Sequence, residues 1–261
     1  MNVLAVIPAR YASTRFPGKP LVDIGGKPMI QHVWERVMQV AEVARVLVAT
    51  DDERIAQAVQ AFGGEVCLTS PAHVSGTDRV WEVAAQYPDY NAILNVQGDE
   101  PFISPACLGQ AIAALARQAE ADMVTAVCPL NLQVPLDRSH WQDANVVKAV
   151  LSDSGQALYF SRSPIPAVRE AADLDRVGVP VYRHLGLYLY RRAALERFTQ
   201  LPPHPLELAE RLEQLRALAA GMRIATILLA EAPVGIDTPD DLERVLAQLP
   251  ALMQEKMIPV L

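Results

Sequence analysis

The chain has 261 residues, of which 51% are hydrophobic and 20% charged, and its formal net charge is −7. This composition is ordinary for a globular protein and excludes an intrinsically disordered chain. Because the balance is acidic and no run of basic residues occurs, we do not expect the chain to bind nucleic acid or a membrane surface.

The beginning of the chain and its cysteines indicate a compartment. An apolar run of strand length follows Met1-Asn2 in place of a signal peptide, and no window reaches the roughly 18 apolar residues that a membrane-spanning helix needs. Cys67, Cys107 and Cys128 lie far apart without CxxC spacing, so we expect free thiols in a reducing compartment. The sequence therefore predicts a cytoplasmic protein without membrane insertion.

Short β-rich runs alternate with segments of helical period over the first half of the chain. The expected strands are Val3–Pro8, Val46–Thr50, Val66–Thr69, Ala92–Val96 and Met123–Val127. The expected helices are Met29–Val40, Glu53–Phe62, Asp78–Gln86 and Pro105–Ala119. This alternation predicts an α/β fold with a mostly parallel sheet and helices on both faces.

The pattern changes after about residue 130. Expected strands Val146–Leu151, Leu185–Tyr190 and Ile224–Leu229 are separated by proline-rich loops. We expect a smaller α+β lobe here, which closes over the ligand-binding edge of the sheet. One helix in this part is predicted from a core stripe of Leu208, Leu212, Leu215 and Ala219.

A cluster of cations follows the first expected strand. Residues 8–20 read PARYASTRFPGKP and contain Arg10, Arg15 and Lys19 around Ser13 and Thr14. Ligands of parallel sheets bind at the carboxyl ends of the strands, where this cluster falls. It matches neither a Walker A loop nor GxGxxG, but forked donors, an ammonium and hydroxyls suit a triphosphate. The alternative is a solvated turn whose cations pair with surface acids.

Two acidic residues are candidate magnesium ligands. Asp99 lies in NVQGDEP directly after an expected buried strand, where a carboxylate is well placed to hold Mg²⁺ near phosphates. Alternatively, it caps the next helix. In GIDTPDD, Thr238 as N-cap, Pro239 and Asp241 form a helix start, which leaves Asp237 as a second ligand.

Several polar residues in the second half have structural explanations as well as functional ones. His184 at a strand end is typical of a hydrogen-bonded structural histidine, and Glu213 and Gln214 read as the solvated flank of a helix. Arg162 lies in an apolar setting. No zinc-binding HExxH, serine-hydrolase GxSxG or kinase loop set occurs.

Taken together, the motifs resemble the 3-deoxy-manno-octulosonate (Kdo) cytidylyltransferase family. The resemblance runs in order from residue 3 to about residue 245, and sialate cytidylyltransferases are similar only loosely. The matching stretches are IPARYASTRFPGKPL (7–21), VATDD (48–52), SGTDR (75–79), NVQGDEP (95–101), NVVK (145–148), YFSRSPIP (159–166), RHLG (183–186), LEQLR (212–216) and DTP (237–239).

The resemblance implies a glycosyltransferase-A-like, Rossmann-like nucleotidyltransferase fold that requires Mg²⁺ and forms a homodimer. The implied reaction activates Kdo for lipopolysaccharide biosynthesis: CTP and Kdo give CMP-Kdo and diphosphate. Together with the change of pattern after about residue 130, we expect a nucleotide-binding core at 1–130, a sugar-binding and dimerisation lobe at 131–230, and a C-terminal return with a metal-binding aspartate and a helix at 231–261, all within one continuous structural domain. Alternatives are a cytidylyltransferase for an 8-amino Kdo analogue and a non-catalytic nucleotide-binding protein of the same fold.

The resemblance also implies the roles of individual residues. The residues implied to be catalytic are Arg15, Lys19, Asp99 and Asp237, and the two aspartates are implied to hold the metal. The residues implied to bind CTP are Arg10, Ser13, Arg15, Lys19, Ser75 and Gly76. The residues implied to contact Kdo are Gln97, Arg162, His184, Glu213 and Gln214.

Overall fold

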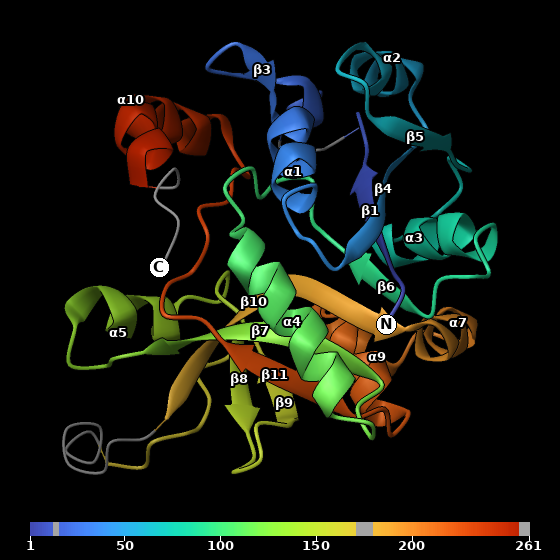
Figure 1. Cartoon of the computed structure of the whole chain (residues 1–261). Coiled ribbons are helices and arrows are strands. Elements are labelled where there is room, and N and C mark those ends of the chain that lie inside the picture. The colour runs from blue at the N-terminus through green and yellow to red at the C-terminus, as the bar shows by residue number, and fades with distance from the viewer. Residues whose placement is uncertain (13–15, 171–179, 256–261) are drawn as a thin grey trace.

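The computed structural model describes residues 1–12, 16–170 and 180–255 (Figure 1). One nine-stranded sheet runs through the molecule in the order β11-β7-β10-β6-β1-β4-β5; β8 pairs with β10, and β9 pairs with β8. A second sheet contains only the short strands β2 (Asp23–Ile24) and β3 (Lys27–Pro28).

The parallel part of the large sheet is formed by the first half of the chain. It contains β1 (Val3–Ala9), β4 (Val43–Thr50), β5 (Glu65–Leu68) and β6 (Ala92–Asn95). β1 pairs in parallel with both β4 and β6. The run Val3–Ile7 is fully buried, as expected for a central strand covered by helices on both faces.

The second half of the chain extends the same sheet. β10 (Val181–Arg191) lies antiparallel between β6 and β7 (Met123–Leu130). β11 (Ile224–Leu228) pairs in parallel with β7, while β8 (Lys148–Leu151) and β9 (Ala157–Ser161) form an antiparallel extension of β10. Strands from residues 131–230 are therefore continuous with those of the first half.

Helices cover both faces, each over its own hydrophobic cluster. On one face lie α1 (Met29–Val37), α2 (Glu53–Ala61) and α4 (Pro105–Arg117), and α4 packs across β7, β10 and β11 (Figure 1). The other face is covered by α3 (Gly76–Ala85), α7 (Arg192–Gln200) and α9 (Gln214–Ala219). The remaining helices are η1 (Lys19–Leu21), α5 (Pro135–Gln142), α8 (Pro205–Glu210) and α10 (Pro239–Glu255).

The predicted fold class is confirmed, and the expected strands and helices of the first half are present with shifted ends. The prediction of a single helix from Leu208 to Ala219 was wrong. The chain breaks it at Arg211, whose φ of 53° is left-handed, into α8 and α9. Leu208 is consequently 65% exposed and Gln214 only 4%, so Gln214 is not on a solvated flank. A left-handed residue ends the i to i−4 hydrogen-bond series of a helix.

The three cysteines are free, as predicted. Among the described residues, no helix combines the length and apolar character needed to cross a membrane.

Candidate active site at the carboxyl edge of the sheet

The loops after β1 and β6 meet at the carboxyl edge of the sheet. Val6 pairs with Asn95 in the parallel register, so the two loops start side by side. A Cβ on Gly98 would lie 3.0 Å from the carbonyl oxygen of Pro8. A side chain at this position would press against the Pro8 backbone, whereas glycine lets the two backbones approach closely without strain.

We therefore expect Gly98→Ala to lower the free energy of unfolding by about 1–2 kcal/mol through overpacking. Denaturant unfolding measures the change. Gly109→Ala in α4 is a matched control, since its Cβ would meet only the Glu42 carboxylate at 3.9 Å. Equal stabilities for the two variants would contradict a close approach at Gly98.

Lys19 joins the two predicted metal ligands. Its Nζ lies 2.8 Å from Asp99 Oδ2 and 3.2 Å from Asp237 Oδ1, and the lysine side chain is only 14% exposed. Two carboxylates that are far apart in sequence thus converge on one cationic position. The partners of Lys19 are these two acids, which differs from a solvated turn with scattered surface pairs.

Asp237 is held in this position by the start of α10. The Asp241 carboxylate accepts hydrogen bonds from the backbone N–H groups of Asp237 (3.0 Å) and Thr238 (2.9 Å) and from the Thr238 hydroxyl (2.8 Å). The N–H of Ile236 donates to the carbonyl of Asp99 (3.0 Å), which ties the two aspartate segments together. The predicted capping role of Thr238 and Asp241 is confirmed.

A cavity of about 330 Å³ opens beside these residues. Of the residues predicted to bind the nucleotide, Arg10, Lys19 and Gly76 line it, together with Gln97 and Asp99. Its other lining residues are Pro8, Ala9, Ala12, Pro20 and Gly98. Ser13 and Arg15, also predicted here, lie outside the described residues.

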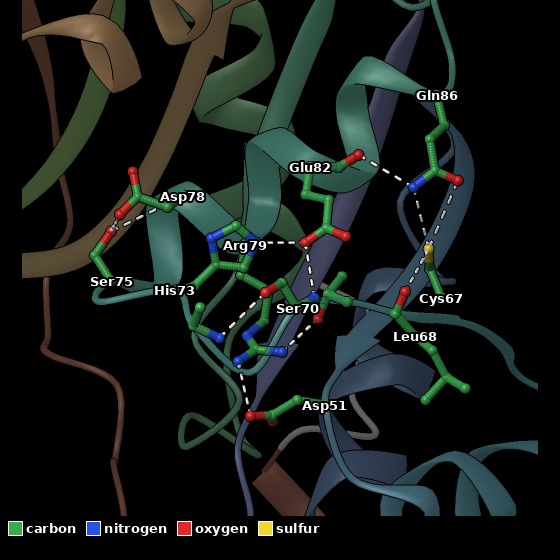
Figure 2. A network of polar contacts seen from close by, with 12 residues as sticks. Asp51, Cys67, Leu68, Ser70, His73, Ser75, Asp78, Arg79, Glu82 and Gln86 are labelled. Atoms are coloured by element: carbon green, nitrogen blue, oxygen red, sulfur yellow. Dashed lines mark hydrogen bonds and ion pairs between the residues drawn. The ribbon is translucent and has the colours of Figure 1, made fainter.

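Arg10 binds the loop between β5 and α3. Its Nη2 donates to the carbonyl oxygens of His73 (2.7 Å) and Ser75 (2.9 Å). Ser75 is the N-cap of α3: its hydroxyl accepts from the N–H of Asp78 (3.1 Å) and donates to the Asp78 carboxylate (2.9 Å), as Figure 2 shows. Arg10 and Ser75 thus shape the wall of the cavity as well as facing or flanking it.

A second cavity, of about 380 Å³, adjoins the first and shares Gln97 and Asp99 with it. Of the predicted sugar contacts, Gln97, His184, Glu213 and Gln214 line it. The lining residues without a predicted role are Glu100, Asn145, Val146, Val147, Arg183, Gly186, Tyr188, Arg211 and Leu212. Most of these lie in the resembling stretches, which could have identified them; Tyr188 and Arg211 carry no such signal.

Glu213 and Gln214 are held by hydroxyl groups from α3 and β10. The Thr77 hydroxyl at the start of α3 donates to Glu213 (2.7 Å), and the Tyr188 hydroxyl donates to Gln214 Oε1 (3.2 Å). The amide nitrogen of Gln214 is buried and has no hydrogen-bond partner among the described residues. It is therefore a donor available to an oxygen of a bound molecule.

His184 is neutral in the folded protein. Burial lowers the pKa of its imidazole to about 3. The Thr125 hydroxyl donates its one hydrogen to the carbonyl of Leu187 (2.8 Å), so it accepts from His184 Nε2 (2.9 Å). Nδ1 is then the unprotonated nitrogen, and His184 offers a ligand a hydrogen-bond acceptor rather than a positive charge.

The neutral His184 makes stability depend on pH. The unfolded chain binds a proton here below about pH 6.5 and the folded chain only below about pH 3, so stability is lost as pH falls through this window. Between pH 7 and pH 4 we expect wild type to lose about 3 kcal/mol more unfolding free energy than His184→Gln. His140→Gln on α5, outside both cavities, should follow wild type in the same urea titrations. Parallel pH profiles for wild type and His184→Gln would contradict the argument.

Arg162 lies outside the lining of either cavity. Its Nε donates to the carbonyl of Glu210 (2.7 Å) and its Nη1 to the carbonyl of Ala144 (3.0 Å). It thereby joins the segments that precede two walls of the second cavity, around Asn145 and around Arg211. Its predicted contact with a sugar stays a prediction.

The acidic side chains of Glu100 and Asp99 both line the second cavity. Burial, and next the charge of Asp99, raise the pKa of Glu100 to about 7. No group of three or more His, Cys, Asp or Glu side chains that could hold a metal occurs in the described part of the chain. Mg²⁺ characteristically uses one or two carboxylates and takes its other ligands from phosphates and water, so the number of carboxylates that Asp99 and Asp237 offer is compatible with this ion.

Comparisons with known proteins point to one family. A family profile described as "Cytidylyltransferase" matches residues 4–224. A 3-deoxy-manno-octulosonate cytidylyltransferase of Geobacter sulfurreducens is 51% identical over 95% of this chain and 100% of its own length. The enzyme of the same name from Vibrio cholerae is 49% identical over 93% of this chain and 96% of its own length.

Comparisons with solved structures point to the same family. A CMP:2-keto-3-deoxy-manno-octonic acid synthetase complexed with CTP superposes with a TM-score of 0.88 at 43% identity, covering 96% of this chain and 99% of that one. A cytidylyltransferase from Leptospira borgpetersenii superposes with a TM-score of 0.60 at 17% identity, over 99% of both chains, and shares the fold.

Proposed function

This chain is a member of the 3-deoxy-manno-octulosonate cytidylyltransferase family, and we propose that it transfers the cytidylyl group of CTP to Kdo, giving CMP-Kdo and diphosphate. The observation that carries the proposal is the meeting of two cavities at Gln97 and Asp99. One cavity suits a nucleoside triphosphate, and the other a polar sugar acid. We propose that the product is used in lipopolysaccharide biosynthesis.

In the proposed reaction the anomeric 2-hydroxyl of Kdo attacks the α-phosphorus of CTP in line. The new bond joins the sugar oxygen to the α-phosphorus, the bond to the oxygen that bridges to the β-phosphate breaks, and the hydroxyl proton leaves to solvent. Both substrates are anions, so the protein contributes chiefly positioning and compensation of charge. Lys19, together with Arg15 as implied by the family resemblance, compensates the charge that builds on the departing diphosphate.

We propose that Asp99 and Asp237 hold Mg²⁺. The fit rests on their carboxylate oxygens, which lie 2.8 and 3.2 Å from the single cationic atom Lys19 Nζ and so already face a common positive charge. When bound, the ion supplies charge compensation at the phosphates and acidifies a neighbouring hydroxyl.

The substrate contacts follow from the two cavities. For CTP we propose Arg10, Lys19, Ser75 and Gly76, together with Ser13 and Arg15 from the family resemblance. For Kdo we propose Gln97, His184, Glu213 and Gln214, with Arg162 carried over from the resemblance. The buried Gln214 amide suits a sugar oxygen, and the His184 acceptor suits a sugar hydroxyl.

We further propose a cytoplasmic homodimer. The dimer is implied by the family resemblance, and the free cysteines agree with a reducing compartment. Light scattering of the purified protein measures its mass directly; a monomer at micromolar concentration would contradict the dimer.

Diphosphate release tests the proposed reaction. The purified protein is incubated with Mg²⁺, each nucleoside triphosphate in turn, and either Kdo, 8-amino-Kdo or sialic acid. We expect release only with CTP and Kdo. Faster release with 8-amino-Kdo than with Kdo would show that the amino analogue is the preferred substrate. No release with any pair, despite CTP binding, would favour a non-catalytic nucleotide-binding protein.

A further inference from the structure

The loop between β5 and α3, residues 69–75, leads directly into Gly76, which lines the nucleotide cavity. Arg10, which also lines the cavity, donates to the carbonyls of His73 and Ser75. The loop therefore supports two lining residues, Arg10 and Gly76, and their position depends on whatever holds the loop.

Glu82 of α3 holds the loop at two points. Its Oε2 accepts a hydrogen bond from the backbone N–H of Ser70 (2.9 Å) and another from the ring Nε2 of His73, as Figure 2 shows. Burial raises the pKa of Glu82, but the hydrogen bonds from His73 and Ser70 outweigh burial and lower it overall. The carboxylate is thus ionised and accepts from both groups.

The first residue of the loop, Thr69, is held by a separate contact. Arg79 of α3 is fully buried, donates to the Thr69 hydroxyl, and pairs with Asp51 at 3.2 Å. Because Thr69 is held in this way, the segment that remains to be positioned is Ser70–Ser75. Within it, Glu82 acts from the α3 side and Arg10 from the cavity side.

The chemistry of the cavity indicates which part of a nucleotide meets this loop. Lys19 supplies the cation that suits phosphates, whereas Pro8, Ala9 and Gly76 offer only backbone and small apolar groups. A flat, uncharged base suits the latter groups. Cytosine differs from uracil by a 4-amino donor in place of a carbonyl acceptor, and backbone carbonyl groups distinguish the two.

We propose that the His73–Glu82 pair is a clasp that positions the 70–75 loop for recognition of the cytosine base. The inference rests on the proposed function and assigns a specificity role to two residues that do not line the cavity. His73 and Glu82 are positioning residues: they act through the loop backbone and not on the reacting phosphate.

The test compares Glu82→Ala and His73→Ala with wild type in steady-state kinetics and in calorimetric CTP binding without acceptor. We expect KM and Kd for CTP to rise about tenfold, as for loss of one or two hydrogen bonds, while kcat and the KM for Kdo stay within about twofold. The preference for CTP over UTP should fall by a similar factor. Glu82→Gln retains an acceptor and should recover part of the CTP affinity.

Gln86→Ala is the matched control. Gln86 lies one turn further along α3, and it contacts Cys67 and the carbonyl of Glu82 but not the loop (Figure 2). Gln86→Ala should leave kcat, the KM values for CTP and Kdo, and the Kd for CTP unchanged. If Glu82→Ala does not fold, His73→Ala, which leaves the Ser70 hydrogen bond in place, gives the same readout.

Two results would overturn the clasp: unchanged CTP affinity in both alanine variants, or equal weakening of CTP and UTP. Wild-type inactivity with CTP and Kdo would instead refute the proposed reaction. The CTP and UTP affinities of the variants would still test the clasp.

Discussion

Asp99→Asn is expected to lose about three orders of magnitude in kcat while it keeps its fold. The substitution preserves shape but removes the charge that faces Lys19 Nζ at 2.8 Å and that we assign to the metal. The side chain is one-third exposed, so its neutralisation does not leave a buried cavity or an unpaired buried charge. Diphosphate release at saturating CTP, Kdo and Mg²⁺ measures the effect, with thermal unfolding as the check on folding.

Asp240→Asn is the matched control. Asp240 is an exposed acid in the first turn of α10, close to Asp237 in sequence but outside both cavities. It should retain wild-type kcat. Near-normal turnover of Asp99→Asn at the same Mg²⁺ concentration would remove the metal role from this residue.

Lys19→Ala is expected to lower kcat by about two to three orders of magnitude and to raise the KM for CTP much less. The reason is that charge accumulates on the departing diphosphate in the transition state, where a single ammonium compensates it best. Lys19→Arg keeps the charge but changes its shape, and should recover part of the activity.

Lys27→Ala controls for the loss of a lysine. Lys27 pairs with Glu35 on the surface, and its side chain is 45% exposed. It should behave as wild type. A Lys19→Ala variant that raises KM for CTP with kcat intact would mean that Lys19 binds the ground state and the transition state equally.

The parallel half of the fold could be predicted from sequence because its strands are short, mostly apolar runs between amphipathic helices. Val3–Ile7 is the clearest example, since burial on both faces leaves no alternation to obscure it. The insertion of β10 between β6 and β7 could not be predicted, because strand order depends on long-range pairing and not on local pattern. The break at Arg211 was missed because the leucine spacing continues across it.

In the candidate site, too, local features could be predicted from sequence and long-range contacts could not. Asp99 could be placed from the end of an expected buried strand, and Asp237 from its position directly before a predicted helix cap, so both were candidate metal ligands from sequence. The Lys19 contact then joined the two acids. His73 and Glu82 gave no sequence signal, because a clasp between a loop and the helix that follows it has no characteristic spacing.

The most direct measurement of the central claim is the ³¹P NMR spectrum of the protein with Mg²⁺, CTP and Kdo, followed over time. The proposed reaction predicts that diphosphate and a phosphodiester of CMP and Kdo appear in equal amounts as CTP disappears. Diphosphate with free CMP alone would indicate hydrolysis, and an unchanged CTP spectrum would indicate no reaction. Either result would contradict transfer between the two cavities that meet at Gln97 and Asp99.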